Sequence, residues 1–261
     1  MNKIAVLYIC TGKYNQFFNG FYESCEKYFL KGIASVEYFV FTDDMNLCSV
    51  SKVHLIKRDC QGFPLDSLLR FEMFLQIKEQ LEKFDYIYFF NANAELQQSV
   101  GIEILPDESG LAMGIWPGKR EHQHPMFFPY ERNKKSKAYV APYGKDYVYF
   151  MGGLNGGTSK AYLDMIQTLS TNIRDDYNRG IIALVHDESH INAYLRTHVC
   201  KKLDREFCLP EEFVKENDNP KNIFRDKVKL DSYFNKGRDR SLGGKILKGI
   251  KILFRAISWY L

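Results

Sequence analysis

The chain has 261 residues, 45% of them hydrophobic and 15% aromatic, which is enough to bury a core in one large domain or two small ones. A formal net charge of +4 does not predict nucleic-acid binding, and six cysteines without metal-like spacing are typical of free thiols in a reducing compartment. The sequence shows no signal peptide and no apolar stretch of about 18 residues, so we expect a cytoplasmic protein without a spanning helix.

The first third of the chain alternates strand and helix patterns. Apolar runs at 4–10, 36–42 and 53–56 predict strands, and amphipathic spacing over 17–30 predicts a helix between the first two. This order indicates a right-handed crossover and a parallel sheet. A nucleoside diphosphate fits at the carboxyl ends of the first two strands, where Thr11 and Tyr14 follow. Tyr14 is equally well interpreted as a base-stacking residue or as an ordinary half-buried tyrosine.

A helix over 66–84 and a strand over 86–90 come next. Arg70 lies in the first turns of that helix, where the dipole disfavours a cation; this suggests an anionic partner, although a solvated arginine is the commoner case. The strand is largely aromatic and ends at Asn91-Ala92-Asn93, at the sheet edge where ligands bind. Two amides there are either a binding site or an asparagine-rich turn, and they would hold a hard divalent cation poorly.

The middle of the chain is less regular. Residues 101–106 and 110–115 predict a short edge strand and a further strand, followed by a basic, proline-interrupted segment over 116–144. A strand over 147–151 then runs into a glycine-rich segment from Gly152 to Gly157, whose backbone a ligand can approach closely. This segment lacks the ending of a phosphate-binding P-loop. A helix is predicted from Thr158 to Leu169.

A dense cluster of titratable residues covers 186–190. It contains His186, Asp187, Glu188 and His190, ahead of a predicted helix that ends near 198. Ser189 and Glu188 are suitable for a helix start, but a cap alone does not need so many titratable groups. A carboxylate that meets the developing positive charge at a sugar's anomeric carbon fits this cluster better.

The tail is basic and then amphipathic. A helix over 242–261 places one set of apolar side chains on one face and cations opposite them. Such a helix is suited to an anionic membrane surface, the interpretation favoured by its cations and by Trp259 and Tyr260. The alternative is a terminal helix that packs on the domain.

Several stretches together resemble glycosyltransferase family 6, which includes the ABO blood-group transferases and the α-1,3-galactosyltransferases. They occur in the family's order and cover most of residues 4–215. The resemblance implies a GT-A fold of the α/β class: one domain over residues 1–240, built on a twisted, mostly parallel sheet flanked by helices. The amphipathic pattern adds a tail helix over 241–261. The matching stretches are YFVFTD at 38–43, LLRFEM at 68–73, NAN at 91–93, GIEILP at 101–106, FPYERNKKSKAYV at 128–140, YFMGGLNGG at 149–157 and HDESHINAYL at 186–195.

The resemblance also implies roles for single residues. Glu188 matches the family's candidate nucleophile, and Asp187 the neighbouring carboxylate at the donor sugar. Asn91 and Asn93 stand where the family has Asp-x-Asp, as in its bacterial branch that works without a metal, so no metal site and no divalent-metal cofactor are expected. Residues expected to bind the UDP-sugar donor are Thr11, Tyr14, Arg70, Asn91, Asn93, Met151, Gly152, Gly153, Asp187, Lys236 and Arg238.

Two positions give conflicting indications of the donor sugar. Gly153 leaves room for an acetamido group, whereas Met151 resembles the galactose-using pattern. The acceptor site departs from the family, with Trp116 in place of a histidine and Val185 in place of a tryptophan; His186 lies beside it. Trp116, Val185 and His186 are expected to contact the acceptor.

The resemblance implies retaining α-1,3 transfer of galactose or N-acetylgalactosamine from a UDP-sugar to a fucosylated β-galactoside. A bacterial enzyme of lipopolysaccharide or O-antigen synthesis would act on an oligosaccharide or lipid-linked glycan at the inner face of the inner membrane, held there by residues 242–261. The alternatives are a transferase that uses another UDP-hexose and a non-catalytic carbohydrate-binding protein. A nucleic-acid partner is not expected, since no matching motif is present.

Overall fold

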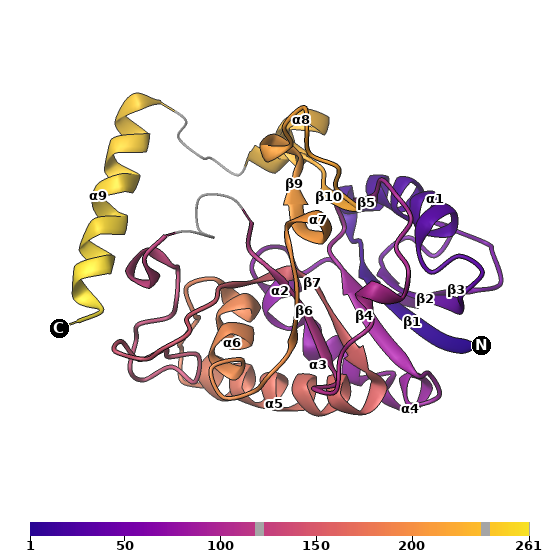
Figure 1. Ribbon diagram of the computed structural model, residues 1–261, viewed down its shortest axis with the longest axis horizontal. Coiled ribbons are helices and arrows are strands. Elements are labelled where there is room, and N and C mark those ends of the chain that lie inside the picture. The colour runs from indigo at the N-terminus through magenta and orange to yellow at the C-terminus, as the bar shows by residue number, and fades with distance from the viewer. Residues whose placement is uncertain (118–122, 236–240, 261) are drawn as a thin grey trace.

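A seven-stranded sheet forms the centre of the computed structural model, which describes residues 1–117, 123–235 and 241–260 (Figure 1). The strand order is β3-β2-β1-β4-β7-β6-β8, and β7 runs antiparallel to both of its neighbours while the other described pairs are parallel. The expected α/β class with a mostly parallel sheet is confirmed. The strands are β1 (Asn2–Ile9), β2 (Ala34–Thr42), β3 (Val53–Lys57), β4 (Tyr86–Phe90), β6 (Leu111–Ile115), β7 (Phe150–Thr158) and β8 (Lys201–Leu203).

The two faces of this sheet bury separate hydrophobic cores. Tyr8 and Tyr88 point into the core that α1 covers, whereas Leu7 and Phe89 point into the core that α3 and α5 cover. Because both faces are buried, the central strands read as continuous apolar runs rather than alternating ones. The helices are α1 (Phe18–Tyr28), α2 (Leu65–Leu68), α3 (Arg70–Leu75), α4 (Lys78–Leu81), α5 (Ser159–Asn178), α6 (His186–Tyr194), α7 (Arg205–Cys208), α8 (Lys227–Leu230) and α9 (Leu242–Ser258).

A small second sheet brings the C-terminal part of the chain back to the centre. Its order is β5-β10-β9, with β10 antiparallel to β5 and parallel to β9. The backbone N–H of Arg225, directly after β10, donates to the carbonyl of Asn93 at 2.8 Å. These strands are β5 (Ala94–Leu96), β9 (Leu209–Pro210) and β10 (Asn222–Phe224), and the 3-10 turns are η1 (Gly12–Phe17), η2 (Ile102–Ile104), η3 (Pro125–Phe127), η4 (Glu211–Phe213) and η5 (Ser232–Asn235).

The predicted single helix over 66–84 is wrong, because the structure divides it into α2, α3 and α4. The backbone leaves the helical region at Leu69 and again at Ile77. Arg70, the first residue of α3, is buried with 4% of its surface exposed. The interruption at Leu69 thus accompanies the burial of a charged side chain, which apolar periodicity does not reveal.

Two predicted strands are also corrected. The segment 101–106 contains the turn η2 (Ile102–Ile104) instead of an edge strand, and the Glu103 side chain accepts the N–H of Gly101 at 2.9 Å. The strand predicted over 147–151 instead runs through the glycines as β7. A Cβ on Gly156 would lie 2.3 Å from the Tyr88 ring, and one on Gly157 would lie 2.4 Å from the Gly110 carbonyl. Glycine therefore serves close strand packing here.

The tail helix α9 touches the body of the protein near its end. Figure 1 shows most of α9 standing away from the sheet. Ala256 and Trp259 are buried, with 0% and 4% exposed, so Trp259 packs on the domain and is not the membrane-interface residue that the sequence suggested. The apolar side chains of α9 that are described as exposed are Ile246, Leu247, Ile250, Ile252, Leu253, Phe254 and Ile257. Among the described residues, no helix combines the length and apolarity needed to cross a membrane.

Candidate active site

The centre of the site is the carboxylate of Glu188, in the first turn of α6. One carboxylate oxygen accepts the backbone N–H of Gly152 at 2.6 Å, and the other accepts the hydroxyl of Tyr149 at 2.6 Å. These donors come from the start of β7 and the residue before it. Two bonds from a strand therefore fix the orientation of a carboxylate carried by a helix.

Local interactions hold α6 against β7. Asn192 accepts the backbone N–H of Phe150 at 2.9 Å and donates to the carbonyl of the same residue at 2.8 Å, so it binds the strand's first residue from both sides. At the helix start, the N–H of Val185 donates to Ser189 at 2.9 Å. The positions of Asp187 and Glu188 in the first turn also suit the positive end of the helix dipole.

A buried ion pair lies beside Glu188. The guanidinium of Arg70 lies 2.8 Å from the Asp187 carboxylate, and only 5% and 9% of the two side chains are exposed. Arg70 also donates to the carbonyl of Gly152 at 2.8 Å. Burial raises the pKa of Asp187, and the Arg70 charge opposes that shift. Arg70 thus links α3, β7 and α6 at the residues that flank the candidate nucleophile.

The two asparagines lie at the end of β4, next to β7. The side-chain amide of Asn91 donates to the side-chain oxygen of Asn93 at 2.9 Å, and Asn93 donates to the carbonyl of Arg225 at 2.7 Å. The backbone N–H of Asn91 donates to the Gly153 carbonyl at 2.8 Å. Neutral amides engaged with each other make a poor donor set for a hard dication. The described residues also contain no group of three or more His, Cys, Asp or Glu side chains suited to a metal.

The two positions expected to influence the choice of donor, Met151 and Gly153, are closely packed. The Met151 side chain is buried, and its terminal carbon lies 3.1 Å from where a Cβ on Gly153 would stand. The Phe224 ring closes the same space from β10, at 3.1 Å. At Gly152, an added Cβ would come within 3.3 Å of the Asp187 carboxylate. A side chain at either glycine would therefore press on groups that line the site.

The expected nucleotide residues lie at the end of β1, under the C-terminal segment. The Tyr14 ring packs against Phe234 with centroids 4.8 Å apart, and the ammonium of Lys227 lies 5.1 Å from its centroid. The N–H of Gly12, next to Thr11, donates to Asp43 at 2.8 Å. Neither Asp43 nor Phe234 was among the residues predicted to bind the nucleotide. Asp43 was detectable as an acid at the end of a parallel strand, whereas Phe234 becomes relevant only through the fold.

The residues expected to bind acceptor are spread around the rim of the site. The backbone N–H of Trp116 donates to the Tyr149 carbonyl at 2.9 Å. The His186 ring stands edge-on to Phe63, whose side chain is exposed, with centroids 4.7 Å apart. Val185, the residue directly before α6, is half-buried. Lys236 and Arg238, the expected diphosphate ligands, lie outside the described residues.

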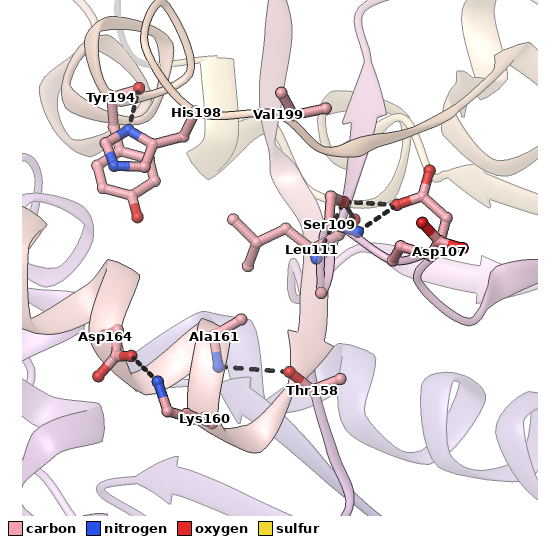
Figure 2. Close-up of a pocket in the computed structure, with 12 residues that line it drawn as sticks. Asp107, Ser109, Leu111, Thr158, Lys160, Ala161, Asp164, Tyr194, His198 and Val199 are labelled. Atoms are coloured by element: carbon pink, nitrogen blue, oxygen red, sulfur yellow. Dashed lines mark hydrogen bonds and ion pairs between the residues drawn. The ribbon is translucent and has the colours of Figure 1, made fainter.

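A hollow of about 640 Å³ lies at the other end of β7 from Glu188. Figure 2 shows Thr158, at the end of that strand, on its wall together with Asp164, Tyr194 and His198. The His198 ring is stacked on Tyr194 with centroids 3.7 Å apart. None of the residues that the sequence predicted to bind donor or acceptor lines this hollow. We therefore place the candidate site at Glu188, where Tyr149, Gly152 and the Arg70–Asp187 pair converge.

The sequence of this chain matches known proteins over most of its length. The model of glycosyltransferase family 6 matches residues 2–230. An O-antigen biosynthesis glycosyltransferase of Escherichia coli, WbnI, is 34% identical over 234 residues, which are 89% of this chain and 98% of that protein. The similarity therefore extends beyond the motifs to the whole seven-stranded sheet and to the residues around Glu188.

Vertebrate relatives match a shorter part of their own length. The globoside alpha-1,3-N-acetylgalactosaminyltransferase 1 of Gallus gallus is 29% identical over 229 residues, 84% of this chain and 63% of that protein. The histo-blood group ABO system transferase 1 of Rattus norvegicus is 33% identical over 205 residues, 75% of this chain and 57% of that protein. Because the family model matches residues 2–230 and the relatives match over most of this chain, the chain belongs to glycosyltransferase family 6.

Proposed function

We propose that this protein transfers galactose or N-acetylgalactosamine from a UDP-sugar to a fucosylated β-galactoside, with an α-1,3 linkage and retention of configuration. The observation that carries the proposal is the Glu188 carboxylate, held by Tyr149 and Gly152 beside the buried Arg70–Asp187 pair. A fixed carboxylate next to a second one matches what a retaining sugar transfer requires.

In the proposed reaction, Glu188 faces the anomeric carbon from the side opposite UDP. The bond between that carbon and the diphosphate oxygen breaks, and its electron pair leaves with UDP. Glu188 either bonds to the carbon or stabilises its positive charge until the acceptor hydroxyl attacks from the vacated face. The hydroxyl proton passes to a phosphate oxygen. Asp187, which Arg70 holds in place, hydrogen-bonds the donor sugar.

The choice of donor is the part of this proposal that needs a direct measurement. Two relatives are named for N-acetylgalactosamine or for the ABO system. We propose a panel of UDP-galactose, UDP-N-acetylgalactosamine, UDP-glucose and UDP-N-acetylglucosamine, each with 2′-fucosyllactose as acceptor. Turnover of one galacto-configured donor is the expected result, whereas turnover of a gluco-configured donor alone would establish the alternative of another UDP-hexose.

We also propose that transfer needs no divalent metal. The support is the amide pair Asn91 and Asn93, which donates and accepts within itself and to Arg225. Charge on the departing diphosphate is then met by cationic side chains of the C-terminal segment and by backbone N–H groups. Equal rates in EDTA and in added Mn²⁺ are expected. Inactivation by EDTA, reversed by Mn²⁺, would refute metal independence.

A non-catalytic carbohydrate-binding protein on the same fold is the second candidate. The observation that favours it is the absence of acidic side chains at positions 91 and 93. The variant Glu188→Gln separates the two functions. An enzyme loses transfer and keeps UDP binding, whereas a binding protein shows no transfer before the change and unaltered glycan binding after it.

We propose that α9 rests on an anionic membrane, where a lipid-linked acceptor would be presented. The exposed apolar residues of α9 include Ile246, Ile250, Leu253 and Phe254, and residues 242–261 contain four cations and no acid. A second copy of the helix would bring like charges together, whereas anionic lipids complement them. The full chain should sediment with vesicles containing phosphatidylglycerol and stay in solution with phosphatidylcholine alone; equal sedimentation with both, or with neither, would contradict this placement.

A further inference from the structure

An aromatic cluster connects the end of the tail helix with the active site. It consists of Phe128, Tyr130, Val140, Tyr149 and Trp259, which pack together as one buried group. The Tyr130 ring lies between the others, 5.9 Å from Trp259 and 5.5 Å from Tyr149 by ring centroids. Contacts of this kind stabilise the relative positions of aromatic rings. The aromatic cluster therefore forms a continuous packed path between α9 and β7.

Trp259 is anchored in this cluster by polar as well as apolar contacts. Its indole N–H donates to the carbonyl of Val140 at 2.7 Å, and 4% of the residue is exposed. The guanidinium of Arg132 lies 5.4 Å from the indole, and the Tyr147 ring stands edge-on to it at 5.3 Å. A buried indole whose N–H is hydrogen-bonded has one well-defined position. The residue at the end of α9 therefore has a specific packing site in the aromatic cluster.

The other end of the path touches Glu188. Tyr149 is 3% exposed, and its hydroxyl donates to the Glu188 carboxylate at 2.6 Å. Its ring is also in contact with Phe128, with centroids 5.9 Å apart. A tyrosine ring has two side-chain torsions, so packing that fixes the ring also fixes the hydroxyl. A shift of the ring would move the hydrogen bond that orients the carboxylate.

A second connection runs from the same segment to the start of α6. Glu131, next to Tyr130 and 8% exposed, accepts the backbone N–H of Leu184 at 2.6 Å. Leu184 lies just before α6, which carries Glu188. Residues 130 and 131 therefore contact both Tyr149, which donates the hydrogen bond to Glu188, and the backbone just before α6, which carries Glu188.

We infer that the last turn of α9 is part of the catalytic apparatus: Tyr149 is a positioning residue for Glu188, and Trp259 holds Tyr149 in place through the aromatic cluster. This inference rests on the proposed function, because it assigns the tail a role in setting the rate of sugar transfer. The tail thereby acts in two ways, with its exposed apolar face available to a membrane and its end completing the site. Removing the tail would slow transfer even to a freely diffusing acceptor.

The test is a double-mutant cycle on the full chain with a soluble acceptor. Tyr149→Phe keeps the ring and removes the hydroxyl, and we expect kcat to fall about 10–100-fold while the donor KM changes less than about threefold. Trp259→Ala should lower kcat about tenfold in the same pattern. If both act through one path, the double variant is no slower than Tyr149→Phe alone, within about threefold.

Matched controls separate positioning from general destabilisation. Tyr38→Phe removes another buried tyrosine hydroxyl that donates to a carboxylate, that of Glu26 at 2.8 Å, and Phe39→Ala opens a cavity at a buried aromatic in the other part of the sheet. Both should leave kcat unchanged at a temperature where the variants are folded by circular dichroism. Trp259→Phe, which retains a ring, should recover most of the kcat lost in Trp259→Ala.

The inference is overturned if Trp259→Ala has the wild-type kcat, or if the losses from Trp259→Ala and Tyr149→Phe multiply.

A readout independent of turnover is available because the chain has two tryptophans. In Trp116→Phe the remaining indole is Trp259, and its emission should be that of a buried tryptophan and should move to the red in Trp116→Phe/Tyr130→Ala. If Trp116→Phe instead shows the emission of an exposed indole, Trp259 is not buried in the aromatic cluster and the inference fails. Absence of turnover by the wild-type protein with every donor would instead contradict the proposed function.

Discussion

Two regions of the protein depart in opposite ways from the usual division between apolar interior and polar surface. One is the corner where β7 meets α6, around Glu188 and the Arg70–Asp187 pair, and the other is the tail helix α9. At the corner, Arg70 and Asp187 are buried as charges. On α9, Phe254 is 71% exposed and Ile246 is 56% exposed. Buried charges lower stability unless they are paired, and exposed apolar side chains gain nothing from folding. We therefore propose that both regions serve binding rather than stability.

The comparison also shows how each region compensates. In the corner, Arg70 and Asp187 form an ion pair with each other, so their charges are balanced within the protein. On α9 the described side chains of Ile246 and Phe254 are largely exposed, and we propose that an anionic membrane covers them. The aromatic cluster joins the two regions through Trp259 and Tyr149.

The largest effect should come from Glu188→Gln. The amide keeps the size of the side chain and removes the negative charge at the anomeric carbon, so kcat should fall about 10³-fold or more while the Kd for UDP changes less than about threefold. The measurement is steady-state transfer together with calorimetric UDP binding. The control is Glu108→Gln, an exposed acid that lines the hollow at the other end of β7. Loss of activity in the control and not in Glu188→Gln would move the active site to that hollow.

The second effect concerns the buried pair. Arg70→Met leaves Asp187 without its cation, and breaking a buried pair on one side costs about 3–5 kcal/mol of unfolding free energy. Without Arg70 the pKa of Asp187, already raised by burial, rises further. The folded state then binds a proton that the unfolded state releases, so the deficit should be larger at pH 8 than at pH 5 in urea denaturation.

The double variant Arg70→Met/Asp187→Asn provides the control for that prediction. It removes both charges and should recover part of the lost stability and abolish the pH dependence of the deficit. If the double variant is less stable than Arg70→Met by the full cost of a second buried polar change, the two side chains do not act as a pair.

His190 should give a smaller, pH-dependent effect. Burial lowers its pKa from 6.5 to about 4, against the opposing charges of Asp176 and Glu131. The unfolded chain therefore binds a proton between about pH 6.5 and pH 4 that the folded protein does not, and stability falls as the pH falls through this window, by about 3 kcal/mol in total. Urea denaturation across the window measures the slope. His190→Gln should flatten it, and an unchanged slope would show that His190 is not the group that titrates.

The smallest effect on the protein itself should come from the face of α9. Ile250→Ser/Phe254→Ser removes two exposed apolar side chains, so the unfolding free energy should change by less than about 0.5 kcal/mol. The affinity for anionic vesicles should fall about tenfold or more. Transfer to a soluble acceptor should be unaffected, in contrast to Trp259→Ala. Undiminished vesicle binding would place the membrane contact elsewhere.

Some features of the fold follow from local sequence and were predicted from it. The aromatic strand before Asn91 and the strand before Thr11 are buried on both faces, and their apolar runs express that directly. The helix that begins after Thr158 follows from its cap, since the Thr158 side chain accepts the N–H of Ala161. In each case the preference of a few neighbouring residues decides the outcome.

Other features depend on contacts between distant residues. The glycines that were interpreted as a ligand-approach segment lie inside β7, where the Tyr88 ring and the Gly110 carbonyl occupy the space that a side chain on Gly156 or Gly157 would need. The predicted helix over 66–84 is divided where Arg70 turns inward to Asp187, which is 117 positions away in the chain. No local pattern contains this information.

The sequence by itself indicated the α/β class, because strand burial is a local property. Its resemblance to glycosyltransferase family 6 indicated the family and made Glu188 and its neighbours the candidate site. Only the tertiary structure decided that Tyr149 and Gly152 hold Glu188, that Asn91 and Asn93 bind each other, and that Trp259 is buried. The physical reason is that hydrogen bonds and ring packing act over a few ångströms in space, and these partners come from β4, β7, α6 and α9, which only folding brings together.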